Sequence, residues 1–219
     1  MRLASLKTSA EEGLKVMELE QSIWFNPQTA SRKLRSLKPV FERLKEVHQH
    51  FIEFGDGDCP YWYPERSHTG LFATAVYECG GVALEEYSDY KMKERKRIKG
   101  RVDLWLKLKT EFRCEAKCVR LNLGGDTRAM AAKASKGLTG AIRDLKNHPD
   151  PHGLALCFLT PHIHQSKLST ADTKLAEFKK VLAPESCCDA LIWIGFSKGE
   201  GIPSGKTRWH GMFLAVVEK

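Results

Sequence analysis

The sequence has no hydrophobic run long enough to cross a membrane. Its longest apolar stretches cover residues 154–159 and 190–196, whereas a helix that spans a bilayer needs about 20 apolar residues. The first residues carry positive charge, but no apolar segment follows them, so we expect no secretory signal. These absences predict a cytoplasmic protein that has no membrane partner.

A disulfide or zinc framework is also missing. The chain has seven cysteines, an odd number, and no two of them have the C-x2-C spacing that structural zinc sites use. We therefore expect reduced thiols that serve as small apolar residues. No repeat or low-complexity segment is visible. A share of 42% hydrophobic and 28% charged residues in 219 positions favours a folded core of ordinary size.

Positive charge is abundant but confined to one segment. Residues 91–120 hold twelve Lys and Arg against four acids, and the rest of the chain has 23 residues of each sign. The whole net charge of +8 therefore belongs to that segment. Such a concentrated surplus is typical of a surface that binds a polyanion, and it favours nucleic acid as the partner.

The first part of the chain is predicted to be helical. Ser9 and Glu12 form a capping box that opens a helix, and this helix ends before Pro27. Pro27 suits the first position of a second helix, which Pro39 is expected to kink or divide. We therefore predict a helical extension at the N-terminus.

The chain is expected to divide near residue 60, with the helical extension over residues 1–60 and the main domain over residues 61–219. The hydrophobic pattern changes from Ser67 onward and predicts a helix, three strands, a helix, a strand, a helix and two strands. This mixture is typical of an α/β fold with a mixed sheet flanked by helices. The expected strands cover residues 82–91, 100–108, 111–119, 154–160, 189–195 and 211–217.

Two acids and a lysine stand out on the second and third of these strands. Asp103 is the only acid on a strand that is otherwise apolar and basic. Glu115 and Lys117 share one face of the next strand, and Ala116 between them points into the core. If the two strands pair, Asp103 faces Glu115. Two carboxylates on adjacent strands suit Mg²⁺, and a lysine beside the metal can orient or deprotonate a water or neutralise charge on a reacting phosphate.

With Asp103 followed by Glu115-Ala116-Lys117, after a helix that carries an acid, the sequence resembles the PD-(D/E)xK nuclease superfamily. The expected order of elements also resembles the α-β-β-β-α-β core of that superfamily over roughly residues 65–160. Val102 stands where the motif's name has proline. The resemblance implies a restriction-endonuclease-like fold, with a mixed sheet flanked by helices.

The resemblance also implies roles for individual residues. Asp103 and Glu115 would bind the metal, the carbonyl of Ala116 could add a ligand, and Lys117 would be the catalytic lysine. A helix carboxylate often completes such sites, and Glu78 is chosen for it, with Glu85 and Glu86 as alternatives. The implied cofactor is Mg²⁺, with Mn²⁺ as a substitute.

The expected function is Mg²⁺-dependent hydrolysis of phosphodiester bonds in DNA, as by an endonuclease. The alternative is a non-catalytic nucleic-acid-binding or assembly protein that keeps the nuclease fold. A homodimer or a partner protein is left open. The basic residues expected to contact nucleic acid are Lys91, Lys93, Arg95, Lys96, Arg97, Lys99, Arg101, Arg113, Lys133 and Lys136.

A glycine-rich stretch near the C-terminus is an unconvincing nucleotide-binding loop. Residues 199–207 end in Gly-Lys-Thr, but neither Gly199 nor Gly201 stands at the four-residue distance that a phosphate-binding loop needs. A strand rather than a helix is expected to follow. We therefore predict a hairpin-like loop there.

Overall fold

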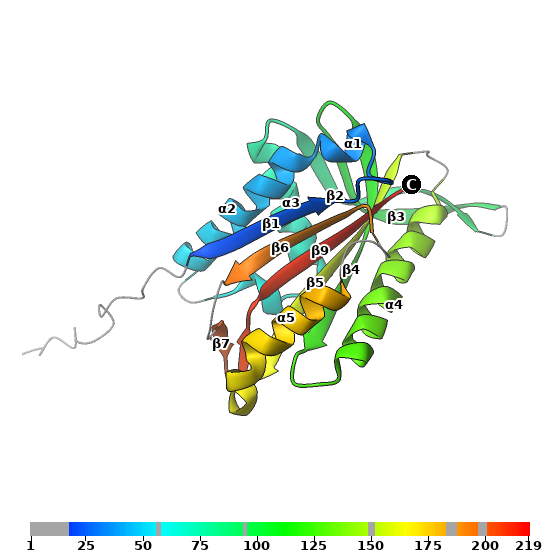
Figure 1. Cartoon of the computed structure of the whole chain (residues 1–219). Coiled ribbons are helices and arrows are strands. Elements are labelled where there is room, and N and C mark those ends of the chain that lie inside the picture. The colour runs from blue at the N-terminus through cyan, green and yellow to red at the C-terminus, as the bar shows by residue number, and fades with distance from the viewer. Residues whose placement is uncertain (1–17, 56–57, 94–95, 149–151, 183–187, 197–200) are drawn as a thin grey trace, which may run out of the picture.

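A nine-stranded sheet forms the centre of the molecule, and helices cover both of its faces (Figure 1). A computed structural model describes residues 18–55, 58–93, 96–148, 152–182, 188–196 and 201–219, without the side chain of Lys93. Within these ranges, no helix is long and apolar enough to span a membrane.

The helices and strands follow the order of the chain. The strands are β1 (Leu19–Phe25), β2 (Val82–Lys93), β3 (Lys96–Lys107), β4 (Glu111–Asn122), β5 (Gly153–His164), β6 (Ala190–Phe196), β7 (Ile202–Ser204), β8 (Thr207–Trp209) and β9 (Gly211–Glu218). The helices are α1 (Arg32–Arg35), α2 (Lys38–Phe54), α3 (Glu65–Glu78), α4 (Thr127–Lys146) and α5 (Ala171–Val181), with short 3-10 turns η1 (Pro60–Trp62) and η2 (Gln165–Thr170).

The sheet is mixed, as its sequence pattern predicts. The strands lie in the order β1-β6-β9-β5-β4-β3-β2, with the β7–β8 hairpin attached to β5. β2, β3 and β4 form an antiparallel meander, and α4 then returns the chain so that β5 runs parallel to β4. The β7–β8 hairpin falls in the stretch for which a hairpin-like loop is predicted, and Gly205 takes a positive φ of 57° at its turn.

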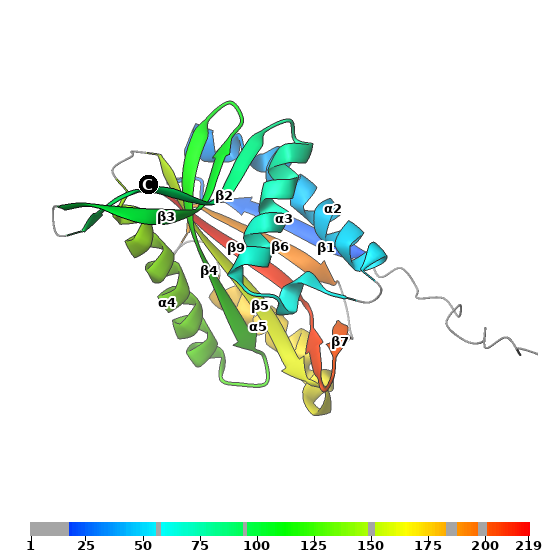
Figure 2. The ribbon, with the colours of Figure 1, turned by 180° about the vertical axis from the view of Figure 1, so that it is seen from behind.

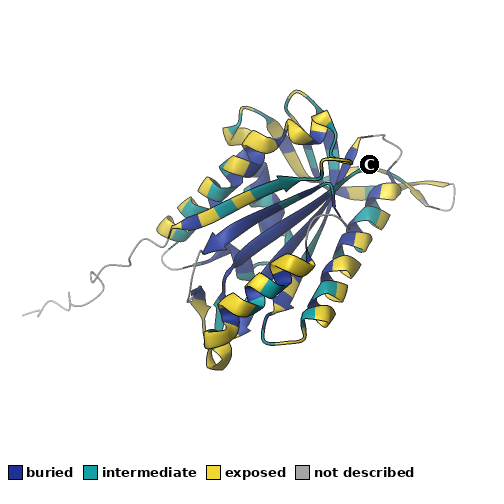
Figure 3. Cartoon of the chain, in the orientation of Figure 1, coloured by how far each residue is buried: buried dark blue, intermediate teal, exposed yellow. Residues whose placement is uncertain are grey.

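Two hydrophobic layers hold the helices to the sheet. α4 and α5 lie on the face seen in Figure 1, and α3 lies on the face seen in Figure 2. α4 presents an apolar stripe at helical spacing that includes Met130, Ala134 and Leu138, and its N-terminus is capped by the side chain of Asp126. α2 and α3 bury Phe41 and other apolar residues against the opposite face. Figure 3 shows the central strands almost wholly buried.

The N-terminal part differs from the predicted helical extension. A helix is predicted up to Pro27, yet Leu19–Phe25 is the edge strand β1 and pairs with β6. Burial alternates over its first half, where Leu19 is buried and Glu20 and Ser22 are exposed, and aromatic residues end it, which suits a half-buried strand.

The helical stretch is divided just before Pro39, as predicted, because α1 ends at Arg35 and α2 begins at Lys38. Pro39 stands in the first turn of α2, where its missing N–H costs nothing. The Ser9–Glu12 capping box lies outside the described residues.

β2 and β3 continue beyond the sheet as a two-stranded ribbon. The β3–β4 pairing ends at Leu104 and Cys114, whereas β2 and β3 stay paired out to Lys93 and Lys96. We call this ribbon, residues 87–93 and 96–102, the arm; Figure 2 shows it projecting past α4. Its backbone N–H at Met92 donates to the carbonyl of Asn147 after α4, at 2.6 Å. The arm is thus held against the end of that helix.

Candidate functional site

The site forms where β3 separates from β4. Backbone N–H groups along a strand point alternately to its two sides, and that of Arg113 bonds to His152 on the β5 side. The N–H groups of Ala116 and Cys118 therefore point to the side that β3 has left. A buried N–H without a partner is costly, so a side chain must replace the missing strand.

Two carboxylates take that place. Asp103 on β3 accepts the Ala116 N–H through Oδ2 at 2.8 Å, and Glu65 at the start of α3 accepts the Cys118 N–H through Oε2 at 3.1 Å. The other oxygen of each carboxylate makes no hydrogen bond to a residue that the structure describes. Each side chain is therefore fixed in place and still has an oxygen able to bind a ligand.

Glu115 lies next to Asp103 and is almost completely buried. Its Oε1 accepts from the Lys91 ammonium at 2.6 Å and lies 2.5 Å from His148 Nε2. Burial alone would raise the pKa of Glu115, but these two partners outweigh it and lower the pKa. Glu115 is therefore ionised at neutral pH.

Asp103 and Glu65 are affected in the opposite direction. Burial raises the pKa of Asp103, the Ala116 N–H opposes this, and the charge of Glu115 adds to it. Burial also raises the pKa of Glu65, and the charges of Asp103 and Glu115 contribute. Like charges that raise one another's pKa are typical of a site that gains by binding a cation.

Lys117 stands on the same face of β4 as Glu115. Its ammonium donates to the Ala116 carbonyl at 2.7 Å and pairs with Asp144 of α4 at 3.0 Å. Burial alone would lower the pKa of Lys117, but Asp144 and then Glu65 outweigh it and raise the pKa. Lys117 therefore stays charged, so it can orient a water or stabilise negative charge but is poorly suited to take up a proton.

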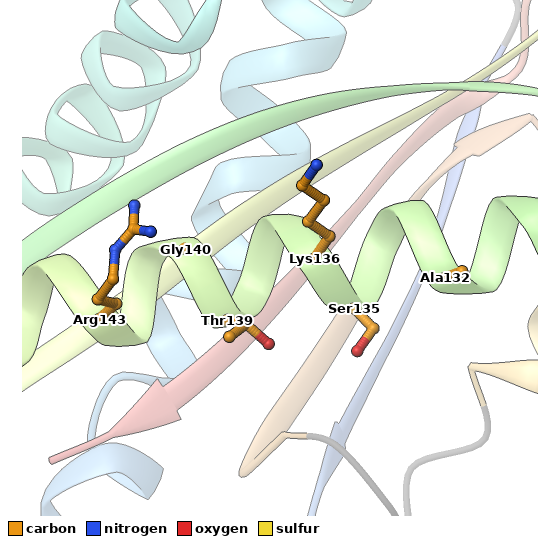
Figure 4. A pocket seen from close by; sticks show the side chains of 6 residues that line it. All are labelled: Ala132, Ser135, Lys136, Thr139, Gly140 and Arg143. Atoms are coloured by element: carbon orange, nitrogen blue, oxygen red, sulfur yellow. The ribbon is translucent and has the colours of Figure 1, made fainter.

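A groove of about 720 Å³ opens from Glu65 and Lys117 and runs along α4. Lys136 and Arg143 are seven positions apart on α4, which puts them on one face, and Figure 4 shows both leaving the same side of the helix. Such a row of cations beside carboxylates can hold a phosphate chain. The basic residues that line the groove are Lys117, Arg120, Lys133, Lys136 and Arg143.

Glu78 does not lie at this site. It is exposed on the last turn of α3 and pairs with Arg43 of α2 at 3.7 Å, about 20 Å along the helix from Glu65 at 1.5 Å per residue. The carboxylate that α3 brings to this site is Glu65, which the sequence prediction missed because the pattern that predicts this helix begins only at Ser67. An acid directly after a proline at a helix start is the signal that could have found it. Glu86, an alternative to Glu78, pairs with Arg66 and Arg101.

The basic residues predicted to bind nucleic acid on the arm and on β4 have different surroundings. Lys91 points inward to Glu115, and Arg113 is neutralised by Asp89 at 3.1 Å and Glu111 at 3.4 Å. These two residues are therefore ill placed to meet a nucleic acid in this conformation. Arg95 and the side chain of Lys93 lie outside the described residues. The exposed basic residues of the arm are Lys96, Arg97, Lys99 and Arg101.

The possible metal ligands at the site are carboxylate oxygens, which suit a hard divalent cation better than a softer one. Across the described ranges, no three His, Cys, Asp or Glu side chains form a ready-made metal cage. Mg²⁺ does not need one, because it is usually held by one or two carboxylates together with water and substrate phosphate. The Lys91 ammonium acts on this site as a cation would, since its charge lowers the pKa of both Asp103 and Glu115. Asp103, Glu115 and Glu65 are the residues that could hold the metal.

Comparison of the chain with models of protein families, with curated proteins and with solved structures finds no match. The arrangement of side chains is therefore the basis on which a function can be argued.

Proposed function

We propose that the protein is a Mg²⁺-dependent nuclease that hydrolyses phosphodiester bonds, with DNA as its substrate. The observation that carries this proposal is that Asp103 and Glu115 each lie within reach of the other's charge, with Glu65 close enough for both charges to raise its pKa, beside the charged Lys117. Carboxylates alone suit many cations. A groove lined by cations that opens beside Glu65 and Lys117 favours a polyanionic substrate.

Each part has a separate task in this proposal. A bound Mg²⁺ would polarise the scissile phosphate and lower the pKa of a water. Asp103 and Glu115 would hold the cation, with Glu65 beside them. Lys117 orients the attacking water and stabilises the charge that develops on the phosphate, because its raised pKa keeps it protonated.

The order α3-β2-β3-β4-α4-β5 supports the resemblance to the PD-(D/E)xK superfamily. In the proposed assignment, Asp103 and Glu115-x-Lys117 keep their motif positions, and Glu65 takes the role of the helix carboxylate. The exposed cations of the arm and those of the groove would follow the phosphate backbone, which gives salt-dependent binding with little sequence information.

The proposal is tested by incubating plasmid, linear duplex and single-stranded DNA with Mg²⁺ or Mn²⁺, and with EDTA as a control. We expect metal-dependent cleavage that Asp103→Asn and Lys117→Ala each reduce at least a hundredfold.

The matched pair is Glu65→Gln against Glu78→Gln, which change one carboxylate at each end of α3. Glu65→Gln should lower the rate at least tenfold and Glu78→Gln should leave it unchanged. Cleavage that survives in Asp103→Asn would overturn the proposal.

The alternative is a nucleic-acid-binding protein without catalysis. The observation in its favour is that Glu115 is already bonded to Lys91 and His148. In that case DNA binding would weaken steeply with salt, and no metal would produce cleavage. The same incubation distinguishes the two functions when it is accompanied by a binding measurement at two salt concentrations.

A further inference from the structure

Lys91 occupies the position at which a cation would approach Glu115. Its ammonium lies 2.6 Å from Glu115 Oε1, and the Glu115 side chain is only 3% exposed. Mg²⁺ loses its waters reluctantly and keeps several of them when bound. A hydrated cation therefore has no room at Glu115 while the Lys91 side chain, itself 19% exposed, covers it.

The backbone of the arm is shaped to let Lys91 reach inward. The Lys91 side chain lies flat against Gly100 on the paired strand, and a Cβ at position 100 would stand 2.9 Å from Lys91 Cγ and Cδ. Any other residue there would push the side chain away. Glu86, at the base of the arm, has a φ of 48°, which is unusual for a residue other than glycine and marks a sharp change of direction in the strand.

The contrast with the rest of the arm is informative. Lys96, Lys99 and Arg101 are exposed, whereas Lys91 is turned toward a buried carboxylate. A surface lysine placed only for affinity would not be desolvated against an acid, because burying a charged pair costs more than leaving both partners in water unless the geometry is excellent. The position of Lys91 therefore calls for a role at the site itself.

We propose that Lys91 is a tethered counterion that competes with the divalent metal for Glu115, and that metal binding releases its ammonium to contact the phosphate backbone of the substrate. This inference rests on the proposed function. Lys91 thus balances the clustered carboxylates when the metal is absent. When the metal is present, Lys91 adds one phosphate contact, so metal and nucleic acid each strengthen the binding of the other, as linkage requires.

The test measures Mn²⁺ binding to the full chain by titration calorimetry, without nucleic acid. We expect Lys91→Met to bind Mn²⁺ at least tenfold more tightly than the wild type, because a competing charge is removed while the length of the side chain is kept. Lys91→Arg should bind Mn²⁺ as weakly as the wild type. Lys99→Met, a change of the same kind on the exposed part of the arm, should have no effect.

Gly100→Ala provides an independent route if Lys91→Met fails to fold. It displaces the Lys91 side chain by contact and should also tighten Mn²⁺ binding. A wild type that binds Mn²⁺ as tightly as Lys91→Met and Gly100→Ala would overturn the counterion role and leave the proposed nuclease standing. Absence of Mn²⁺ binding in the wild type and in both variants would also overturn the counterion role, whereas the proposed nuclease is overturned only by the cleavage test with Asp103→Asn.

Discussion

The carboxylates of Asp103 and Glu65 each have a structural function and a possible binding function. One oxygen accepts a backbone N–H that would otherwise be unpaired in the gap between β3 and β4, and the other oxygen is left for a ligand. The hydrogen bond fixes the direction of the side chain without neutralising it. The burial that this position demands raises the pKa of both groups, so a site of this kind is built at a cost to stability.

Replacing Asp103 with Asn should therefore stabilise the protein at neutral pH. A carboxyl whose pKa is higher in the folded than in the unfolded chain holds its proton more tightly when folded, so its ionisation as the pH rises costs stability. Asn keeps an oxygen for the Ala116 N–H and carries no charge. We expect urea unfolding at pH 7 to give Asp103→Asn an advantage of about 1 kcal/mol, and the advantage should vanish at pH values where Asp103 is protonated in both states. A variant less stable than the wild type at pH 7 would contradict this account.

At the scale of the element, the approach of α4 to the sheet depends on one of its two central glycines. A Cβ at Gly137 would stand 2.4 Å from Val119 Cγ2 and 3.1 Å from Cys157 Sγ, whereas one at Gly140 would meet nothing closer than Lys117 Cγ at 3.8 Å. The two glycines lie on one helix, three positions apart. Gly137 is thus required by packing, and Gly140 is not.

This difference predicts opposite effects for the same substitution. Gly137→Ala overpacks the contact between α4 and β4 and should destabilise the protein by about 1–3 kcal/mol. Gly140→Ala gains helix propensity and should stabilise it by up to about 1 kcal/mol. Chemical denaturation of the two variants beside the wild type measures both effects. Equal destabilisation by the two substitutions would show that the helix does not pack as described.

The elements that sequence patterns predict well are those whose pattern has one interpretation. The alternation over residues 100–108 and 111–119 predicted the paired parts of β3 and β4, where apolar residues on one face of each strand are buried, but it missed residues 96–99 of β3 and 120–122 of β4. β1 was missed because the polar residues Glu20, Gln21 and Ser22 are consecutive, so this short edge strand has no alternation of apolar and polar residues that would predict a strand.

The partners of the site were missed for another reason. Glu65 bonds to a residue 53 positions away and His148 to one 33 positions away. No local sequence pattern shows that β3 separates from β4 and leaves backbone N–H groups of β4 to be paired by side chains.

At the scale of the whole molecule, the layer between the sheet and helices α2 and α3 contains two buried histidines. His48 on α2 is 1% exposed and His68 on α3 is 0% exposed. Neither ring nitrogen of His48 bonds to a residue that the structure describes, and its ring lies 5.5 Å from that of Tyr61. Burial and then the neighbouring His68 lower the pKa of His48 to about 3, and burial and then Arg120 lower that of His68 to about 4.

The fold should therefore lose stability as the pH falls below 6.5. Between about pH 4.5 and 6 the unfolded chain binds a proton on each of these two histidines that the folded chain does not, and the lowered pKa values of the partly buried His162 and His210 act in the same direction. Each proton contributes about 1.4 kcal/mol per pH unit, so His48 and His68 together should lower the free energy of unfolding by nearly 3 kcal/mol per unit. Urea unfolding at pH 7, 6 and 5 measures the slope. His48→Leu and His68→Leu should each reduce the slope by about 1.4 kcal/mol per pH unit, because leucine of similar volume carries no proton. His50→Gln is the control on the same helix, because His50 is exposed, and it should leave the slope unchanged. A slope that neither leucine substitution reduces would place the acid sensitivity elsewhere in the molecule.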